Sequence, residues 1–294
     1  MKTDLDCIPC LLRQSLEAAR MVSADASLHE QILRDTLKWM QEMDFNQSPP
    51  ALGQRVHRQL RRMTGAADPY RTAKDRLNRL ALELIPAYQT LLETDSDPLQ
   101  MAVRLAIAGN MMDMGVNANL TEADVRQTME QALQAPFWGE MEKFRQAIAG
   151  AQSILYLADN AGEIAFDRLL VEQLPTGRVT VAVRGHPVIN DATLQDAQAV
   201  GLDQIVEVVE NGSDAPGTLL QDCSADFRRR FAEADLIIAK GQGNFETLSD
   251  VPGNLFFLFK VKCRVVASHV GQPIGMQVLM QSAAFPTGGE AATE

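Results

Sequence analysis

The spacing of apolar residues changes near residue 150, and this change constrains the fold more than any other feature of the sequence. Before that point apolar side chains recur every three or four residues, which is the period of an amphipathic helix. After it they form short runs rich in Val, Ile and Phe, with helical stretches between them. Such alternation is typical of a mostly parallel sheet covered on both faces. The pattern predicts an α/β protein, with an all-α domain over 1–150, a three-layer α/β/α domain over 151–285 and a frayed tail over 286–294.

The same pattern places the individual elements. No strand is expected before Gly150, because the apolar runs there have helical spacing. Helices are predicted over 9–22, 29–43, 49–63, 70–92, 98–114, 121–133 and 136–151, and strands over 153–159, 178–184, 205–210, 235–241, 254–260 and 263–268.

Charge and hydropathy exclude several classes of protein. The formal net charge of −11 argues against a nucleic-acid-binding protein, which needs clustered Lys and Arg to contact phosphates. No apolar segment reaches the roughly 18 residues that a bilayer span requires, so no membrane partner is expected. The N-terminus has no apolar signal-peptide core, which predicts a cytoplasmic protein whose four cysteines are reduced. The sequence leaves the oligomeric state open.

Polar side chains gather where the predicted strands end. Asp159 and Asn160 follow the first strand, and Asn190 and Asp191 follow the second. In open α/β sheets ligands bind outside the carboxyl ends of the strands, so we expect these residues at one edge. Oxygen ligands from Asp159, Asn160 and Asp191 would suit Mg²⁺ or Mn²⁺, with positions left for water and phosphate. The alternative is that they cap the following helices, with Glu163 in a capping role.

The later strands bring glycines and basic residues to the same edge. In "KGQGNFETL", Gly241 and Gly243 would let backbone amides approach an anion, and the helix predicted from Asn244 would offer its positive end. Lys240 adds a point charge, and Lys260 ends the next strand. The loop lacks the spacing of a P-loop and the third glycine of a dinucleotide fingerprint, so by itself it does not identify the ligand.

Two polar features of the helical half, a pair of polar residues and a C-x-x-C motif, can each be interpreted in more than one way. Asn110 and Asp113 lie at i, i+3 on an otherwise apolar helix, where they either cap a neighbouring helix or point into the cleft. Cys7 and Cys10 form a C-x-x-C motif that opens a helix. A redox pair would follow a strand, and a structural zinc site needs four ligands. The role of this motif is left open, as is that of His186.

Several motifs in combination resemble one protein family. They are "CIPC", "DPYRTAKD", "AGNMMDMG", "DNAGEIAFD", "GHPVINDAT" and "KGQGNFETL". From Cys7 to about Gly271 the chain is similar to the DUF89 proteins, which are metal-dependent damage-control phosphatases. Its C-x-x-C motif and its length resemble the subfamily typical of archaea and bacteria.

The resemblance implies a fold, a cofactor and an activity. The fold would be a helical N-terminal domain on a Rossmann-like α/β domain, and the cofactor a divalent ion such as Mn²⁺, Ni²⁺, Co²⁺ or Mg²⁺. The substrates would be sugar phosphates or other small phosphorylated metabolites, often damaged ones. Carried over residue by residue, the catalytic metal ligands would be Asp159, Asn160 and Asp191. Substrate contacts would come from Asn110, Asp113, Glu163, Lys240, Gly241, Gly243, Asn244 and Lys260.

Two routes to hydrolysis of a phosphate monoester stay open. Either Asp159 attacks phosphorus directly, or water activated by the metal attacks, with Asp159 or Glu163 as base. Haloacid dehalogenase phosphatases carry a second Asp two residues on, where this chain has Ala161, and this favours the water route. The rival interpretations are a non-catalytic sugar-phosphate or nucleotide-binding protein, a redox or metal-delivery role for the C-x-x-C motif, and a carboxyl methyltransferase. No S-adenosylmethionine glycine loop follows the first predicted strand.

Overall fold

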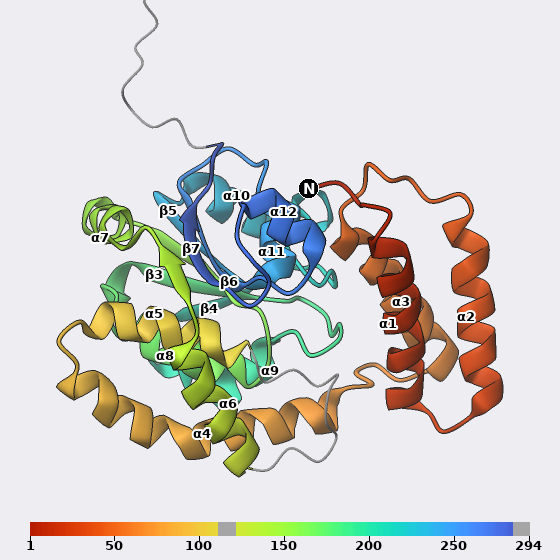
Figure 1. Ribbon diagram of the computed structural model, residues 1–294, viewed down its shortest axis with the longest axis horizontal. Coiled ribbons are helices and arrows are strands. Elements are labelled where there is room, and N and C mark those ends of the chain that lie inside the picture. The colour runs from red at the N-terminus through yellow and green to blue at the C-terminus, as the bar shows by residue number, and fades with distance from the viewer. Residues whose placement is uncertain (111–121, 285–294) are drawn as a thin grey trace, which may run out of the picture.

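One mixed sheet forms the centre of the protein (Figure 1). The computed structural model describes residues 1–110 and 122–284, and within these ranges the sheet has seven strands in the order β1-β7-β6-β5-β2-β3-β4. Neighbouring strands are parallel except for β6 and β7. The strands are β1 (Phe137–Gly139), β2 (Ile154–Leu157), β3 (Val179–Val183), β4 (Glu207–Glu210), β5 (Leu236–Lys240), β6 (Leu255–Lys260) and β7 (Gln277–Gln281).

Helices cover both faces of this sheet, because the side chains of each strand alternate between two apolar cores. On β2, Tyr156 lies in the core that includes helices α4 to α9, while Leu157 lies in the core that includes α10 to α12. The predicted α/β class with a three-layer α/β/α arrangement is therefore confirmed. No helix in the described ranges is both long and apolar enough to cross a membrane. The helices are α1 (Cys7–Val22), α2 (Ala26–Met40), α3 (Pro49–Thr64), α4 (Arg71–Thr94), α5 (Pro98–Gly109), α6 (Glu122–Gln134), α7 (Met141–Gly150), α8 (Glu163–Val171), α9 (Leu194–Ala199), α10 (Ala225–Glu233), α11 (Gly241–Leu248) and α12 (Arg264–Val270).

The N-terminal helices divide into two groups by their packing. Helices α1 to α3 form two small apolar clusters of their own and lie beside the sheet in Figure 1. Helices α4 to α7 instead share the large core with the strands. The domain boundary at residue 150 stays a prediction, but the apolar core extends across it.

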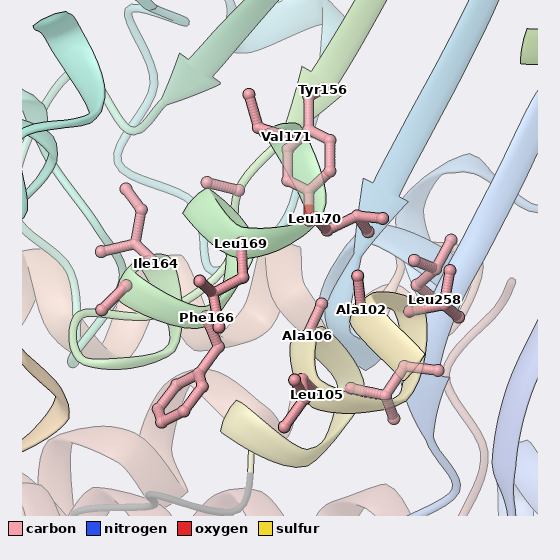
Figure 2. Close-up of a cluster of buried hydrophobic side chains, with 14 of the residues drawn as sticks. Ala102, Leu105, Ala106, Tyr156, Ile164, Phe166, Leu169, Leu170, Val171 and Leu258 are labelled. Carbon is pink, nitrogen blue, oxygen red and sulfur yellow. The ribbon is translucent and has the colours of Figure 1, made fainter. Parts of the chain in front are cut away.

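Close packing of α5 on α8 brings the first polar residues of the site together. Leu105 and Phe166 lie in the same apolar cluster, which Figure 2 shows. A methyl group on Gly109 would lie 3.1 Å from the Phe166 ring and 3.3 Å from the Cα of Glu163. The end of α5 therefore approaches the start of α8 closely, and Asn110, which follows α5, lies beside Glu163.

Three details of the predicted elements are wrong. A strand, β1, does precede residue 150, within the predicted helix 136–151, and it pairs with β7 far along the chain. The run 263–268 belongs to helix α12 rather than a strand, because six residues are too few for the apolar period to decide. The strand β7 was not predicted. Residues 111–121 and the tail 286–294 lie outside the described residues.

Candidate functional site

The carboxyl ends of β2, β3 and β5 meet where the strand order reverses. From β2 the chain proceeds outward through β3 and β4 on one side, and β5 and β6 lie on the other. In open α/β sheets a crevice forms outside such a point and binds ligands. The first loop, residues 158–162 after β2, carries Asp159 and Asn160. The second loop, residues 184–193 after β3, carries Asp191.

The backbones of these two loops are bonded to each other. Asn160 and Asp191 form an isolated antiparallel bridge. The amide of Ala192 donates to the carbonyl of Asp159 at 2.8 Å. The three predicted metal ligands are therefore brought side by side by main-chain contacts.

Two amides hold two buried carboxylates. The Nδ2 of Asn110 donates to Asp159 Oδ2 at 2.8 Å and to Glu163 Oε2 at 2.7 Å. The Nδ2 of Asn160 donates to the same two oxygens, at 2.8 Å each. Both amide nitrogens are thereby committed, so each residue can offer a ligand only its carbonyl oxygen. The Oδ1 of Asn110 is buried and accepts no hydrogen bond within the described ranges.

Arg184, for which the sequence predicted no role in the site, joins the aspartates of the two loops. Its side chain is 1% exposed, its Nε donates to Asp191 Oδ2 at 2.7 Å, and its Nη2 lies 3.7 Å from Asp159 Oδ1. Its position directly after β3 was the available signal. The neighbouring His186 is exposed, and its role stays open.

Burial disfavours the charged forms of the carboxylates at this site. Burial raises the pKa of Asp159 to about 8, with further contributions from Glu163 and Asp191. Burial also raises the pKa of Asp191, against the opposing charge of Arg184. Such a site favours an added positive charge. Within residues 1–110 and 122–284 no three His, Cys, Asp or Glu side chains form a complete metal-binding group, so a ligand set here needs the amide oxygen of Asn160.

Lys240 lies behind the carboxylates rather than at the open edge. It is fully buried, and its Nζ donates to Glu163 Oε1 at 2.7 Å, Asp167 Oδ1 at 2.5 Å and the carbonyl of Ala106 at 2.8 Å. These three acceptors take all three ammonium protons. The structure shows that Lys240 contacts Glu163. The predicted contact between Lys240 and the substrate stays a prediction.

The glycine loop after β5 is built into helix α11. The helix begins at Gly241, not at Asn244 as predicted, and Gly241 packs against Asp159. Gly243 packs against the backbone of Pro216. The buried Asn244 donates to the carbonyl of Lys240 at 2.7 Å. Gly243 and Asn244 thus have structural roles, one in backbone packing and the other in a hydrogen bond. Their predicted contacts with the substrate stay predictions.

Of the two lysines at the end of β6, Lys260 and Lys262, it is Lys262 that reaches the site. Its Nζ lies 3.4 Å from the carbonyl of Asn110, and its charge opposes the rise in the pKa of Asp159. Lys260 is half-buried, and burial lowers its pKa, followed by the repulsion of Lys262. The predicted contact of Lys260 is untested, and Asp113 lies outside the described residues.

Comparison with known proteins identifies the family. The model of the damage-control phosphatase ARMT1-like domain matches residues 3–278. A damage-control phosphatase of Archaeoglobus fulgidus is 34% identical over 288 residues, covering 95% of this chain and 98% of that protein. One from Pyrococcus horikoshii is 31% identical, covering 96% and 99%.

A solved structure agrees with this assignment. The crystal structure of a DUF89 family protein from Pyrococcus horikoshii superposes with a TM-score of 0.87 at 30% identity, covering 96% of this chain and 99% of that one. The match extends over the helical half as well as the sheet. The chain therefore belongs to the DUF89 family, the proteins with the ARMT1-like domain of damage-control phosphatases, as its motifs predicted.

Proposed function

We propose that this protein is a metal-dependent phosphatase that hydrolyses phosphate monoesters of small metabolites, such as sugar phosphates or damaged phosphorylated metabolites. The observation that carries the proposal is the group of three buried carboxylates, Asp159, Glu163 and Asp191, in the segments that follow β2 and β3. Relatives named damage-control phosphatases support the reaction class.

Asp159, Asn160 and Asp191 would hold the divalent ion, as Mn²⁺, Ni²⁺, Co²⁺ or Mg²⁺. Two carboxylates and one amide oxygen are hard ligands that several of these ions accept. The raised pKa of Asp159 and the unpartnered Oδ1 of Asn110 both fit a site that lacks positive charge. When bound, the ion would neutralise charge on the phosphoryl oxygens and lower the pKa of a water molecule.

The chain's own side chains would orient the reacting groups. Both oxygens of Glu163 are occupied by donors, Oε1 by Lys240 and Oε2 by the two amides. The Oδ2 of Asp159 is occupied in the same way, which leaves Oδ1 as the oxygen with bonding capacity. Asp159 Oδ1 would therefore either attack phosphorus or accept the proton of the attacking water. Lys262 would bind a phosphoryl oxygen at the rim.

A phosphate-release screen tests the proposal. Sugar phosphates and phosphorylated cofactors are assayed with each of the four ions, using wild-type protein, Asp159→Asn and the exposed control Asp203→Asn. We expect release by the wild type and the control, and a loss of about 1,000-fold or more in kcat/KM for Asp159→Asn. Near-normal turnover of Asp159→Asn with Mn²⁺ would contradict both routes. Tight binding of a phosphorylated ligand without release on any combination would favour the non-catalytic binding protein.

A further inference from the structure

One face of helix α4 carries a group of polar residues that the reaction does not use. Arg71, Lys74 and Asn78 are spaced by three and four residues and therefore lie on one face. All three contact Asp196, whose side chain is fully buried. Arg71 Nη2 lies 2.6 Å from Oδ1, Asn78 Nδ2 2.9 Å from Oδ1, and Lys74 Nζ 2.8 Å from Oδ2.

Asp196 is in turn bonded to the end of the second loop. The backbone N–H of Thr193 donates to Asp196 Oδ2 at 2.8 Å, and the Thr193 hydroxyl donates to the same oxygen at 2.7 Å. The first of these bonds is one half of the capping box at the start of α9. Since Thr193 lies two residues after Asp191, a shift of Asp196 is transmitted to a predicted metal ligand.

Asn78 also reaches the first loop. Its Oδ1 accepts a hydrogen bond of 2.6 Å from the backbone N–H of Gly162, which lies two residues after Asn160. The side chain is 1% exposed, so water does not compete for either contact. One amide group thus donates toward the second loop and accepts from the first.

We propose that Asn78 is a positioning residue that, beside the main-chain bonds between the two loops, fixes the ends of the loops that carry the metal ligands. Arg71 and Lys74 hold Asp196 so that Asn78 has a fixed partner. This inference rests on the proposed function, because it concerns the same metal site. Removal of a group bonded directly to a metal ligand typically lowers metal affinity about 10- to 100-fold. Asn78 acts through Gly162 and Asp196 rather than on a ligand itself, but it contacts the segments after both ligand loops, and this range sets the scale of the expected effect.

Binding of Mn²⁺ without substrate tests the inference, measured by isothermal titration calorimetry beside the melting temperature. We expect Asn78→Ala to weaken Mn²⁺ binding by about 10- to 100-fold. The matched control is Leu84→Val, since Leu84 is a fully buried residue of α4 in the apolar core. It should lower the melting temperature while the dissociation constant for Mn²⁺ stays within about twofold of the wild type.

A conservative variant separates positioning from general stability. Asn78→Asp keeps an acceptor for Gly162 but replaces the donor toward Asp196 with a second carboxylate, so it should weaken Mn²⁺ binding as Asn78→Ala does. Asn78→Asp keeps the size of the side chain, so the result does not depend on whether Asn78→Ala folds.

Two outcomes would overturn the inference. Folded Asn78 variants that bind Mn²⁺ as tightly as the wild type would do so, and so would equal weakening in Leu84→Val. A wild-type chain that binds none of the four divalent ions would instead contradict the proposed function, and the positioning role would fall with it. The wild-type titration therefore distinguishes the two failures.

Discussion

Gly241 and Asp159 lie so close that no side chain fits between them. A methyl group built on Gly241 would lie 1.9 Å from Asp159 Oδ2, and Gly241 has a φ of +80°, in the left-handed region that favours glycine. From the sequence, Gly241 was expected to let an anionic ligand approach the backbone. In the structure, the space beside Gly241 is taken by the carboxylate of Asp159. The position of Asp159 depends on the absence of a side chain at the start of α11.

Gly241→Ala should therefore abolish metal binding and phosphate release. Gly271→Ala is the matched control, because Gly271 has a φ of +68° and no described heavy atom within 4 Å of an added methyl group. Both variants should lose about 1 kcal/mol of stability from backbone strain. Only Gly241→Ala should lose Mn²⁺ affinity, measured by calorimetry. Equal affinities in the two variants would contradict the prediction.

Replacement of Lys240 should lower the free energy of unfolding, because its main role is to pair with buried carboxylates rather than to bind substrate. Lys240→Met leaves the buried carboxylates of Glu163 and Asp167 without their cation, which should cost about 3 to 5 kcal/mol of the free energy of unfolding. The exposed Lys262→Met should change it by no more than about 0.5 kcal/mol but lower kcat/KM. Urea unfolding of the metal-free variants provides the comparison. A change below about 1 kcal/mol in Lys240→Met would count against the structural role.

The C-x-x-C motif should be dispensable for phosphate release. Burial, the largest cause, raises the pKa of both Cys7 and Cys10, whereas a redox-active thiol needs a lowered one. The double variant Cys7→Ser, Cys10→Ser should keep kcat/KM within about threefold, and Asp191→Ala should lose about 100-fold or more. The opposite ranking would favour the redox or metal-delivery interpretation.

Glu246 should make stability depend on pH between about 4.5 and 7. Burial raises its pKa from 4.5 to about 7, so its protonated form stabilises the fold below the unfolded-state pKa, and this contribution is lost as pH rises through 7. Relative to wild type, Glu246→Gln should therefore gain about 1 to 2 kcal/mol on going from pH 5 to pH 8. Urea unfolding at the two pH values measures this, with the exposed Glu42→Gln as a control that should show no such gain.

Local sequence signals predicted the order of the elements and the edge at which polar residues gather. The apolar run of β2 and the Asx residues after it are short-range features, and the structure has them where they were expected. Contacts between distant segments could not be predicted in this way. The strand β1 exists because residues 137–139 pair with β7, and no local period reports that pairing. The role of Arg184 was likewise not predicted, because its contact with Asp159 depends on how the two loops are placed in space.

The packing of α5 against the sheet also has a consequence for synthesis on the ribosome. Leu105 and Leu258 belong to one apolar cluster, yet 153 residues separate them in the sequence (258 − 105 = 153). At about 5 to 20 residues per second, α5 is completed roughly 8 to 30 seconds before β6 emerges. During that interval the part of its apolar surface that packs on β6 lacks its native partner. The nascent helical half is therefore the stage of biogenesis at which a chaperone would have most to protect.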